Sequence, residues 1–333
     1  MNDSVADAKH AEAAMTHRSS YVARINRVLD HIDTCLAEPL DLEALASVAH
    51  FSAWHFHRVF RAMTGETLAD CVRRRRLEVA AGRLLTSPSI AASSIAFDVG
   101  FASPEVFTRA FRSHFGVTPS AWRRGAYREW AATHHVQLSK IHQAESKLHQ
   151  AVAEVFRHDR SLWPWGHVAP TGDLNMEVEV KNLPETRVAY MRNVGPYGGV
   201  GIPRTWQRFA AWCEQHGLTK PRRTMYGVCQ DDPDITPPEK CRYDACIEVD
   251  ASFKPEGEVG VQTITGGRYA CAKFAGTSAD VRAAWIRFLA EWMPDSGYQA
   301  DDRPALELYD KDFVMDEKTG AFTCLLCMPV RRV

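Results

Sequence analysis

The sequence has no hydrophobic run long enough to cross a membrane, since a spanning helix needs roughly 18 or more apolar residues. Its first 20 residues are polar and carry both charge signs, so they also lack the apolar segment of a secretory signal. Cysteine is sparse and odd in number, with 9 in 333 residues, which argues against a disulfide framework and favours reduced thiols. These absences predict a cytoplasmic protein that does not contact a membrane.

Lysine is missing from Tyr21 to Gly125, although this stretch contains 13 arginines and 10 acidic residues. Its apolar residues follow a helical period, whereas residues 174–333 alternate expected strands and helices and contain most of the glycine and proline. We therefore expect a disordered tail at 1–20, an all-α domain at 21–125, a linker with one helix at 126–173, and an α+β domain at 174–333.

The all-α domain contains an internal repeat, offset by 51 residues from Ser52 onward. Each copy reads as a short helix, a tight turn and a second helix, which begins after Ser52 or Ser103 and ends at Gly65 or Gly116. A serine hydroxyl caps a helix N-terminus, and glycine adopts the left-handed conformation that ends a helix. The repeat thus predicts two helix-turn-helix units.

The second helix of each unit has one apolar and one polar face. The apolar faces are spaced for burial and consist of Phe56, Val59, Phe60 and Met63, then Phe107, Ala110, Phe111 and Phe115. The opposite faces consist of Trp54, His57, Arg58 and Arg61, then Glu105, Thr108, Arg109 and Arg112. Arginine can bond two acceptors of guanine, and Thr or Trp can contact a thymine methyl, so these faces suit a DNA major groove. The alternative is a pair of solvated faces, which the recurrence of arginine at matching positions disfavours.

A helix expected at Thr67–Leu85 connects the two units and contains the run Arg73–Arg76. Its 19 residues span about 28 Å, and successive major grooves on one face of DNA lie about 34 Å apart. A stiff rod of this length can hold two recognition helices in adjacent grooves. The arginine run would lie near phosphates, although helix geometry points the four side chains in different directions and leaves some in solvent.

Three segments resemble the DNA-binding signature of AraC/XylS-type regulators: Ile95–Phe101, Phe107–Arg112 and Phe115–Arg123. The resemblance extends over Tyr21–Arg124. It implies a sequence-specific transcription factor that places two recognition helices in adjacent major grooves of double-stranded DNA and acts with RNA polymerase. By this resemblance the bases are read by Trp54, His57 and Arg58 in the first groove and by Pro104, Glu105, Thr108 and Arg109 in the second. Several relatives have a neutral amide at the place of Glu105, and cytosine N4 is a suitable partner for its carboxylate.

The α+β domain also repeats, because Arg187–Tyr190 corresponds to Arg268–Cys271. Each segment is followed by a glycine-containing turn, an amphipathic helix with tryptophans and two further strands. Each half is therefore predicted to be strand-helix-strand-strand, and the two form one antiparallel sheet with both helices on one face. The other face would be left to solvent or to a ligand.

Glu307 is the main effector-binding candidate on this sheet. Strand alternation in Ala305–Tyr309 puts Leu306 and Leu308 toward the helices, so that Glu307 and Tyr309 face the open side. The same hollow would be lined by Tyr226 on the equivalent strand, with Trp206 and Tyr197 as weaker candidates. A carboxylate among aromatic rings favours a cationic or amide-bearing ligand, unless it is a surface glutamate paired with an arginine.

Residues 187–330, with the motif Pro304–Tyr309, resemble the GyrI-like effector-binding domain. That family binds small, often lipophilic and cationic molecules between two pseudo-symmetric halves, and its characteristic acidic residue corresponds to Glu307. The combination implies a ligand-responsive transcriptional regulator that is not an enzyme and holds no cofactor or metal. Cys324 and Cys327 point to opposite faces of one strand, so we interpret them as core residues. Two alternatives remain: a GyrI-like hydrolase that uses Glu307 on a reactive small molecule, and an architectural DNA binder.

Overall fold

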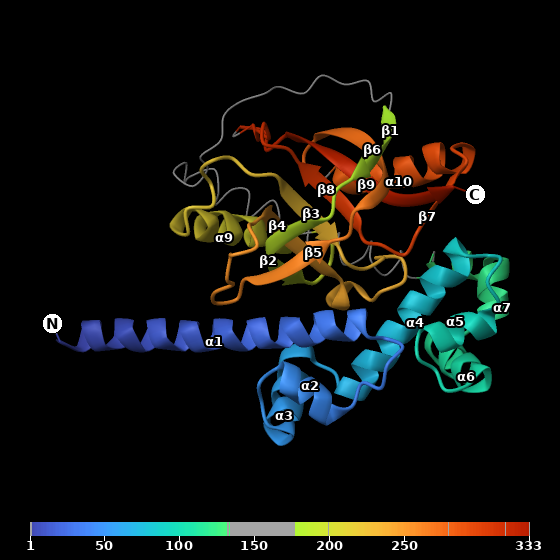
Figure 1. Cartoon of the computed structure of the whole chain (residues 1–333), viewed down its shortest axis with the longest axis horizontal. Coiled ribbons are helices and arrows are strands. Elements are labelled where there is room, and N and C mark those ends of the chain that lie inside the picture. The colour runs from blue at the N-terminus through green and yellow to red at the C-terminus, as the bar shows by residue number, and fades with distance from the viewer. Residues whose placement is uncertain are drawn as a thin grey trace. The chain divides into compact units, whose positions relative to one another are not determined.

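The computed structural model of the chain describes residues 2–131, 133, 177–198, 200–278, 280–316 and 318–332. The chain divides into two compact units, one built mainly from Met1–Trp130 and the other mainly from Ala131–Phe253 and Val261–Val333 (Figure 1). The helix expected in the linker lies outside the described residues. Within those residues, no helix is long and apolar enough to cross a membrane.

The first unit is all-α. Its helices are α1 (Asn2–Thr34), α2 (Leu42–Val48), α3 (Ala53–Thr64), α4 (Leu68–Thr86), α5 (Ala92–Asp98), α6 (Pro104–Phe115) and α7 (Pro119–Ala121), followed by a π-helical turn at Trp122–Ala126. The pairs α2–α3 and α5–α6 are the two expected helix-turn-helix units, and α4 is the rod that connects them (Figure 1). The structure differs from the expected disordered tail, because α1 begins at Asn2 in a segment rich in alanine, the strongest helix former.

The ends of α3 and α6 form as the repeat predicts. The Ser52 and Ser103 hydroxyls accept backbone N–H groups of the first helical turn, and Gly65 and Gly116 end the helices with φ of 74° and 76°. The core face is formed by buried Phe56, Phe60, Phe107, Phe111 and Phe115, with Val59 and Ala110 half-buried. Met63 belongs to the predicted apolar face but is 41% exposed. It lies in the last turn of α3, after the buried residues Phe56 and Phe60.

Two arginines of α4 form buried ion pairs, so the expectation that the run lies along DNA phosphates is wrong for them. Arg74 donates to Glu66 at 2.7 Å and to Glu78 at 3.0 Å. Arg75 donates to Glu78 at 2.8 Å and to Asp33 of α1 at 2.9 Å. The Arg75 side chain is 9% exposed and the Glu78 side chain 2% exposed. These guanidinium groups hold the rod inside the unit.

The other two arginines of the run differ from each other. Arg76 donates to backbone carbonyl groups of the unit, whereas Arg73 pairs with Asp70 and keeps 60% of its side chain exposed. Consecutive helical residues point in directions about 100° apart, and α4 is enclosed on several sides. Arg73 is thus the one member of the run that is mostly in solvent.

The second unit is α+β. Its elements are β1 (Val178–Leu183), β2 (Thr186–Val194), α9 (Gly201–Gln215), β3 (Met225–Cys229), β4 (Arg242–Glu248), β5 (Gly260–Ile264), β6 (Gly267–Gly276), α10 (Val281–Arg287), β7 (Tyr298–Ala300), β8 (Ala305–Tyr309) and β9 (Phe322–Arg332), with short helical turns at Pro238–Lys240, Phe288–Trp292 and Met293–Asp295. The strands form one sheet in the order β1-β6-β9-β8-β3-β4-β2-β5, and β7 pairs with β9.

The sheet consists of two pseudo-symmetric halves, β2-α9-β3-β4 and β6-α10-β8-β9, which confirms the predicted repeat. The halves meet where β3 pairs antiparallel with β8, and we call this junction the seam. Gly227 lies directly opposite Glu307 at the centre of the seam. Strands β1 and β5 are exchanged, because β1 pairs with β6 and β5 lies beside β2.

Both faces of the sheet are buried, which corrects the expectation of an open face. On one face, Trp206 of α9 and Trp285 of α10 pack with Tyr309 and its neighbours. The opposite face buries a second cluster that contains Tyr226 and Leu306. Among the described residues, all members of this cluster lie on strands, so we infer that the sheet curls over its own face.

Arg75→Ala should lower the free energy of unfolding by about 3 kcal/mol, because removal of one partner leaves buried charge less well compensated. We expect the lower end of the range of losses for a broken buried pair, because Arg74 still pairs with Glu78 in this variant. The matched variant Arg73→Ala removes an exposed pair on the same helix and should change the value by about 0.5 kcal/mol or less. Urea unfolding of the full chain, followed by far-ultraviolet circular dichroism, checks both. Equal effects of the two variants would contradict the buried network.

Candidate DNA-reading surface and effector site

The eight side chains expected to read DNA all lie exposed on α3 and α6. On α3, Trp54 is 71% exposed, and the guanidinium carbon of Arg58 lies 4.8 Å from the centre of its ring. His57 and Arg61 are exposed on the same helix. Stacking on an aromatic face holds a guanidinium in place and leaves the N–H groups at its edge free to donate. Helix α3 therefore presents the oriented N–H donors of Arg58 to an acceptor outside the protein.

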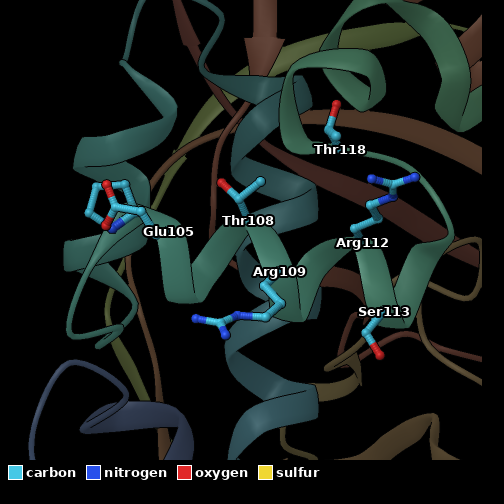
Figure 2. Close-up of a pocket in the computed structure, with 7 residues that line it drawn as sticks. Glu105, Thr108, Arg109, Arg112, Ser113 and Thr118 are labelled. Carbon is cyan, nitrogen blue, oxygen red and sulfur yellow. The ribbon is translucent and has the colours of Figure 1, made fainter.

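The exposed face of α6 lines an open hollow (Figure 2). Its lining is formed by Pro104, Glu105, Thr108, Arg109, Arg112, Ser113 and Thr118. Glu105 lies in the first turn of α6, where hydrogen bonds from Ser103 and from its own backbone lower the pKa of the carboxyl. The hollow thus combines a carboxylate acceptor with two arginines that enter no ion pair among the described residues.

Sequence reasoning missed two members of this hollow, Ser113 and Thr118. Ser113 directly follows Arg112 on α6, so the helical spacing of the sequence could have included it. Thr118 caps α7 through its hydroxyl, and only the fold brings it beside α6.

Tyr21 of α1 supports the start of α3, and the repeat gave no sign of this contact. Its hydroxyl lies 3.1 Å from Nε2 of His55, and its ring centre lies 5.1 Å from that of Phe51. Arg24 of the same helix donates to the backbone carbonyl of His50 at 3.1 Å. Helix α1 therefore fixes the turn that precedes α3.

In the second unit, Glu307 lies at the seam beneath the two helices, on the face opposite to the one predicted. The Tyr243 hydroxyl donates to Oε2 of Glu307 at 2.6 Å, and the Tyr309 hydroxyl donates to the same oxygen at 2.8 Å. Above them, the Trp206 indole donates to the Tyr243 hydroxyl at 3.1 Å. The Trp285 indole of α10 also hydrogen-bonds to Glu307. Both helices thus contribute one tryptophan to the surroundings of one carboxylate.

Gly227 makes room for this arrangement. A Cβ at this position would collide with the Tyr243 hydroxyl and would lie 2.7 Å from Oε2 of Glu307. Any side chain opposite Glu307 would therefore displace the hydrogen-bonded pair. The pseudo-symmetric positions 227 and 307 carry the smallest residue and the charged one, so that the site holds a single carboxylate.

The structure brings Trp206 and Tyr309 together with Glu307 but separates Tyr226 from it. Tyr226 pairs in register with Leu308, and side chains directly opposite in a sheet share a face, so Tyr226 belongs to the curled face. Tyr197 supports the site indirectly: its hydroxyl donates to the Arg242 carbonyl at 2.5 Å, and its ring lies 6.3 Å from that of Tyr243.

Sequence reasoning missed Tyr243, Trp285 and Gly227. The repeat carried a signal for Trp285, because it matches Trp206 in the two amphipathic helices. The contact of Tyr243 depends on the register of β3 with β4 and β8, which no sequence pattern displayed.

Glu307 differs from the buried carboxylates of Asp244 and Asp231 in having no cationic partner among the described residues. Asp244 pairs with Arg192 at 2.7 Å, and Asp231 pairs with Arg242 at 2.8 Å. Burial raises the pKa of Glu307, although the hydrogen bonds from Tyr243, Tyr309 and Trp285 act in the opposite direction. The site is therefore a buried acceptor, aromatic on its sides, that a cation can complement.

Two family models match the chain: a GyrI-like small molecule binding domain at residues 176–331 and a helix-turn-helix domain at 45–125. The regulatory protein SoxS of Escherichia coli (strain K12) is 37% identical over 109 residues, which are 33% of this chain and 97% of SoxS. The DNA gyrase inhibitor of Erwinia billingiae is 29% identical over 160 residues, 47% of this chain and 99% of the inhibitor. A crystal structure of the AdpA DNA-binding domain with a target DNA is 32% identical at a TM-score of 0.29, covering 32% of this chain and 93% of that one.

The two family models agree with the two units of the structure, one with tandem helix-turn-helix pairs and one with a pseudo-symmetric sheet. They also favour control of transcription by an effector over the hydrolase alternative. The chain belongs to the AraC/XylS-type family of DNA-binding transcriptional regulators, with a C-terminal GyrI-like domain for the small molecule that controls it.

Proposed function

We propose that α3 and α6 enter two adjacent major grooves of one DNA duplex. The observation that carries this proposal is the exposure of all eight reading residues on two helices that one 19-residue rod connects. At about 28 Å, the rod is comparable to the about 34 Å repeat of the groove. The proposal assigns the DNA-binding domain to residues 21–125 and the effector domain to 174–333, and it includes cytoplasmic action together with RNA polymerase.

Within this proposal, Arg58 and Arg109 donate to guanine, while Thr108 and Trp54 contact thymine methyl groups. Glu105 accepts from cytosine N4, which its ionised carboxyl supports. His57, Arg61 and Arg112 complete the contacts along the two grooves.

We further propose that the effector is a small lipophilic cation whose charge lies against Glu307. The absence of an ion pair at Glu307 among the described residues and the flanking Trp206 and Trp285 support this choice. Glu307 is only 7% exposed, so the effector must displace part of the aromatic cover as it binds. Binding then shifts the equilibrium between two states of the protein, because the effector has different affinities for them.

We propose that the site binds its ligand without turnover. Oε2 of Glu307 already accepts two phenol hydroxyls, and this arrangement holds a fixed negative charge instead of activating water. Unchanged ligand, recovered after long incubation with the wild-type chain, is the expected result, and release of a product would favour the hydrolase.

Arg58→Ala and Arg109→Ala should each weaken specific DNA binding by about 1–3 kcal/mol, because each removes a donor pair to a base edge. The probe is a duplex selected by the wild-type chain from a random-sequence library, with a scrambled duplex for comparison. Arg27→Ala, which removes an exposed arginine of α1 outside both reading faces, should leave the ratio of the two affinities unchanged. If both reading variants keep the wild-type ratio, these arginines do not read bases.

Glu307→Gln should weaken binding of the cation tetraphenylphosphonium at least about tenfold, a change of about 1.4 kcal/mol. Tetraphenylborate, an anion of the same shape, should bind the wild-type chain poorly. Glu179→Gln, at an exposed position of β1, is the control and should behave as wild type. Calorimetric titration of the full chain measures all of these, and equal affinity for the two ions would contradict a charge-reading site.

Cation affinity should also depend on pH through Glu307. Because burial raises its pKa, the carboxyl takes up a proton at a higher pH than an exposed glutamate does. The cation needs the ionised form, so affinity should be full above this raised pKa and should fall as the pH is lowered through it. Titrations over a pH series check this, and Glu307→Gln should abolish the dependence.

A further inference from the structure

Arg76, near the middle of α4, donates to three backbone carbonyl groups. Its Nε lies 2.9 Å from the Leu36 oxygen, one terminal nitrogen lies 2.7 Å from the Gly100 oxygen, and the other lies 2.9 Å from the Glu38 oxygen. Each nitrogen of the guanidinium thus has its own acceptor. A planar fork with all of its nitrogens engaged fixes the direction of its partners more strictly than a point charge does.

The three acceptors belong to the two different halves of the DNA-binding unit. Leu36 and Glu38 lie between α1 and α2, at the entrance to the first helix-turn-helix. Gly100 lies in the turn between α5 and α6, immediately before the second recognition helix. The Arg76 guanidinium therefore ties the two halves together at one point of the rod.

Gly100 confirms that the halves touch at this point. A Cβ on Gly100 would collide with the Leu36 carbonyl oxygen and would lie 2.8 Å from the guanidinium carbon of Arg76. The equivalent turn of the first unit contains His50, which has a positive φ of 53° and nevertheless carries a side chain. At Gly100 the φ is larger, 89°, and disfavours a side chain by itself, and the close approach of the two halves also leaves no room for one.

Arg76 also differs from its neighbours in the run. Arg74 and Arg75 pair with carboxylates, which compensates their charge. The hydrogen bonds of Arg76 go to carbonyl groups instead, and burial lowers its pKa. The contacts of Arg76 therefore fix the orientation of the segments they join and do less to neutralise its charge.

We propose that Arg76, with Gly100 as its partner, is a positioning residue that fixes the distance and orientation between α3 and α6 and so sets the half-site spacing that the regulator accepts. This rests on the proposal that the two helices enter adjacent grooves. Two rigidly joined modules bind a correctly spaced site far more tightly than either module alone, and they lose this gain when the spacing changes. One added base pair turns the second half-site by about 34–36° around the duplex.

The experiment measures binding of the full chain to a series of duplexes. The parent duplex is selected from a random-sequence library by the wild-type chain, and footprinting locates its two half-sites. The series inserts or deletes one base pair between them, and two further duplexes each keep one half-site with the other scrambled. The proteins are wild type, Arg76→Lys, Arg76→Met and the control Arg73→Ala.

For the wild type and Arg73→Ala, a change of one base pair should weaken binding about tenfold or more. For Arg76→Lys and Arg76→Met, the parent duplex should bind about tenfold more weakly and the change of spacing should cost less than about threefold. Affinity for the single half-sites should stay at the wild-type value, which shows that each helix-turn-helix is intact. Arg76→Lys keeps a charge at this position, so it decides the outcome if Arg76→Met fails to fold.

The results separate the two proposals. A wild-type chain indifferent to spacing contradicts reading by two fixed helices, and the inference fails with it. A wild-type chain sensitive to spacing, together with Arg76 variants that keep the full spacing preference, overturns the role of Arg76 alone. Variants that lose single half-site affinity as much as full-site affinity also overturn it, because their defect then lies within one helix-turn-helix.

Discussion

The DNA-binding unit depends on guanidinium groups buried in the rod between its two recognition helices. A buried charge is costly unless it is compensated, and α4 compensates its own in two ways. Arg74 and Arg75 use carboxylates of α4, of α1 and of the turn before α4, whereas Arg76 uses backbone carbonyl groups. Because such pairs add little net stability compared with apolar packing, their main effect is geometric. These contacts join α4 to α1, to the turn before α4 and to the turn before α6.

The second unit meets a similar constraint at its seam. A pseudo-symmetric sheet repeats the same surroundings twice, and two glutamates at the symmetric positions would repel each other. The chain has glycine at 227 and glutamate at 307, so one half provides the charge and the other provides the space. The two covering helices follow the pseudo-symmetry, because α9 carries Trp206 and α10 carries Trp285.

The sequence was sufficient for the order of helices and strands and for the exposed faces of α3 and α6. Serine caps, glycine stops and apolar spacing are local signals, and they placed α3 and α6 correctly together with the exposed set that includes Arg58 and Arg109. The burial of the arginine run was not predicted because charge alone does not reveal burial: Asp33, the partner of Arg75, lies on α1, far from α4 in the sequence.

The effector site shows a second limit. Alternation in β8 correctly separates Leu306 from Glu307, but it does not tell which set the helices cover. Polarity gives no answer either, because the curled sheet buries both faces. Tyr243 joins the site through strand register, and register follows from pairing across the whole sheet.

The compensation of charge also relates the two proposed sites. Among the described residues, Arg58 and Arg109 enter no ion pair on the reading faces, and Glu307 enters none at the seam. These groups have opposite signs, so a cation suited to Glu307 has no attraction for the arginine faces, and DNA phosphate has none for Glu307. The two ligands therefore do not compete for one site. Any influence of one on the other must pass through a difference in the protein's own conformational equilibrium, and linkage makes that influence equal in both directions.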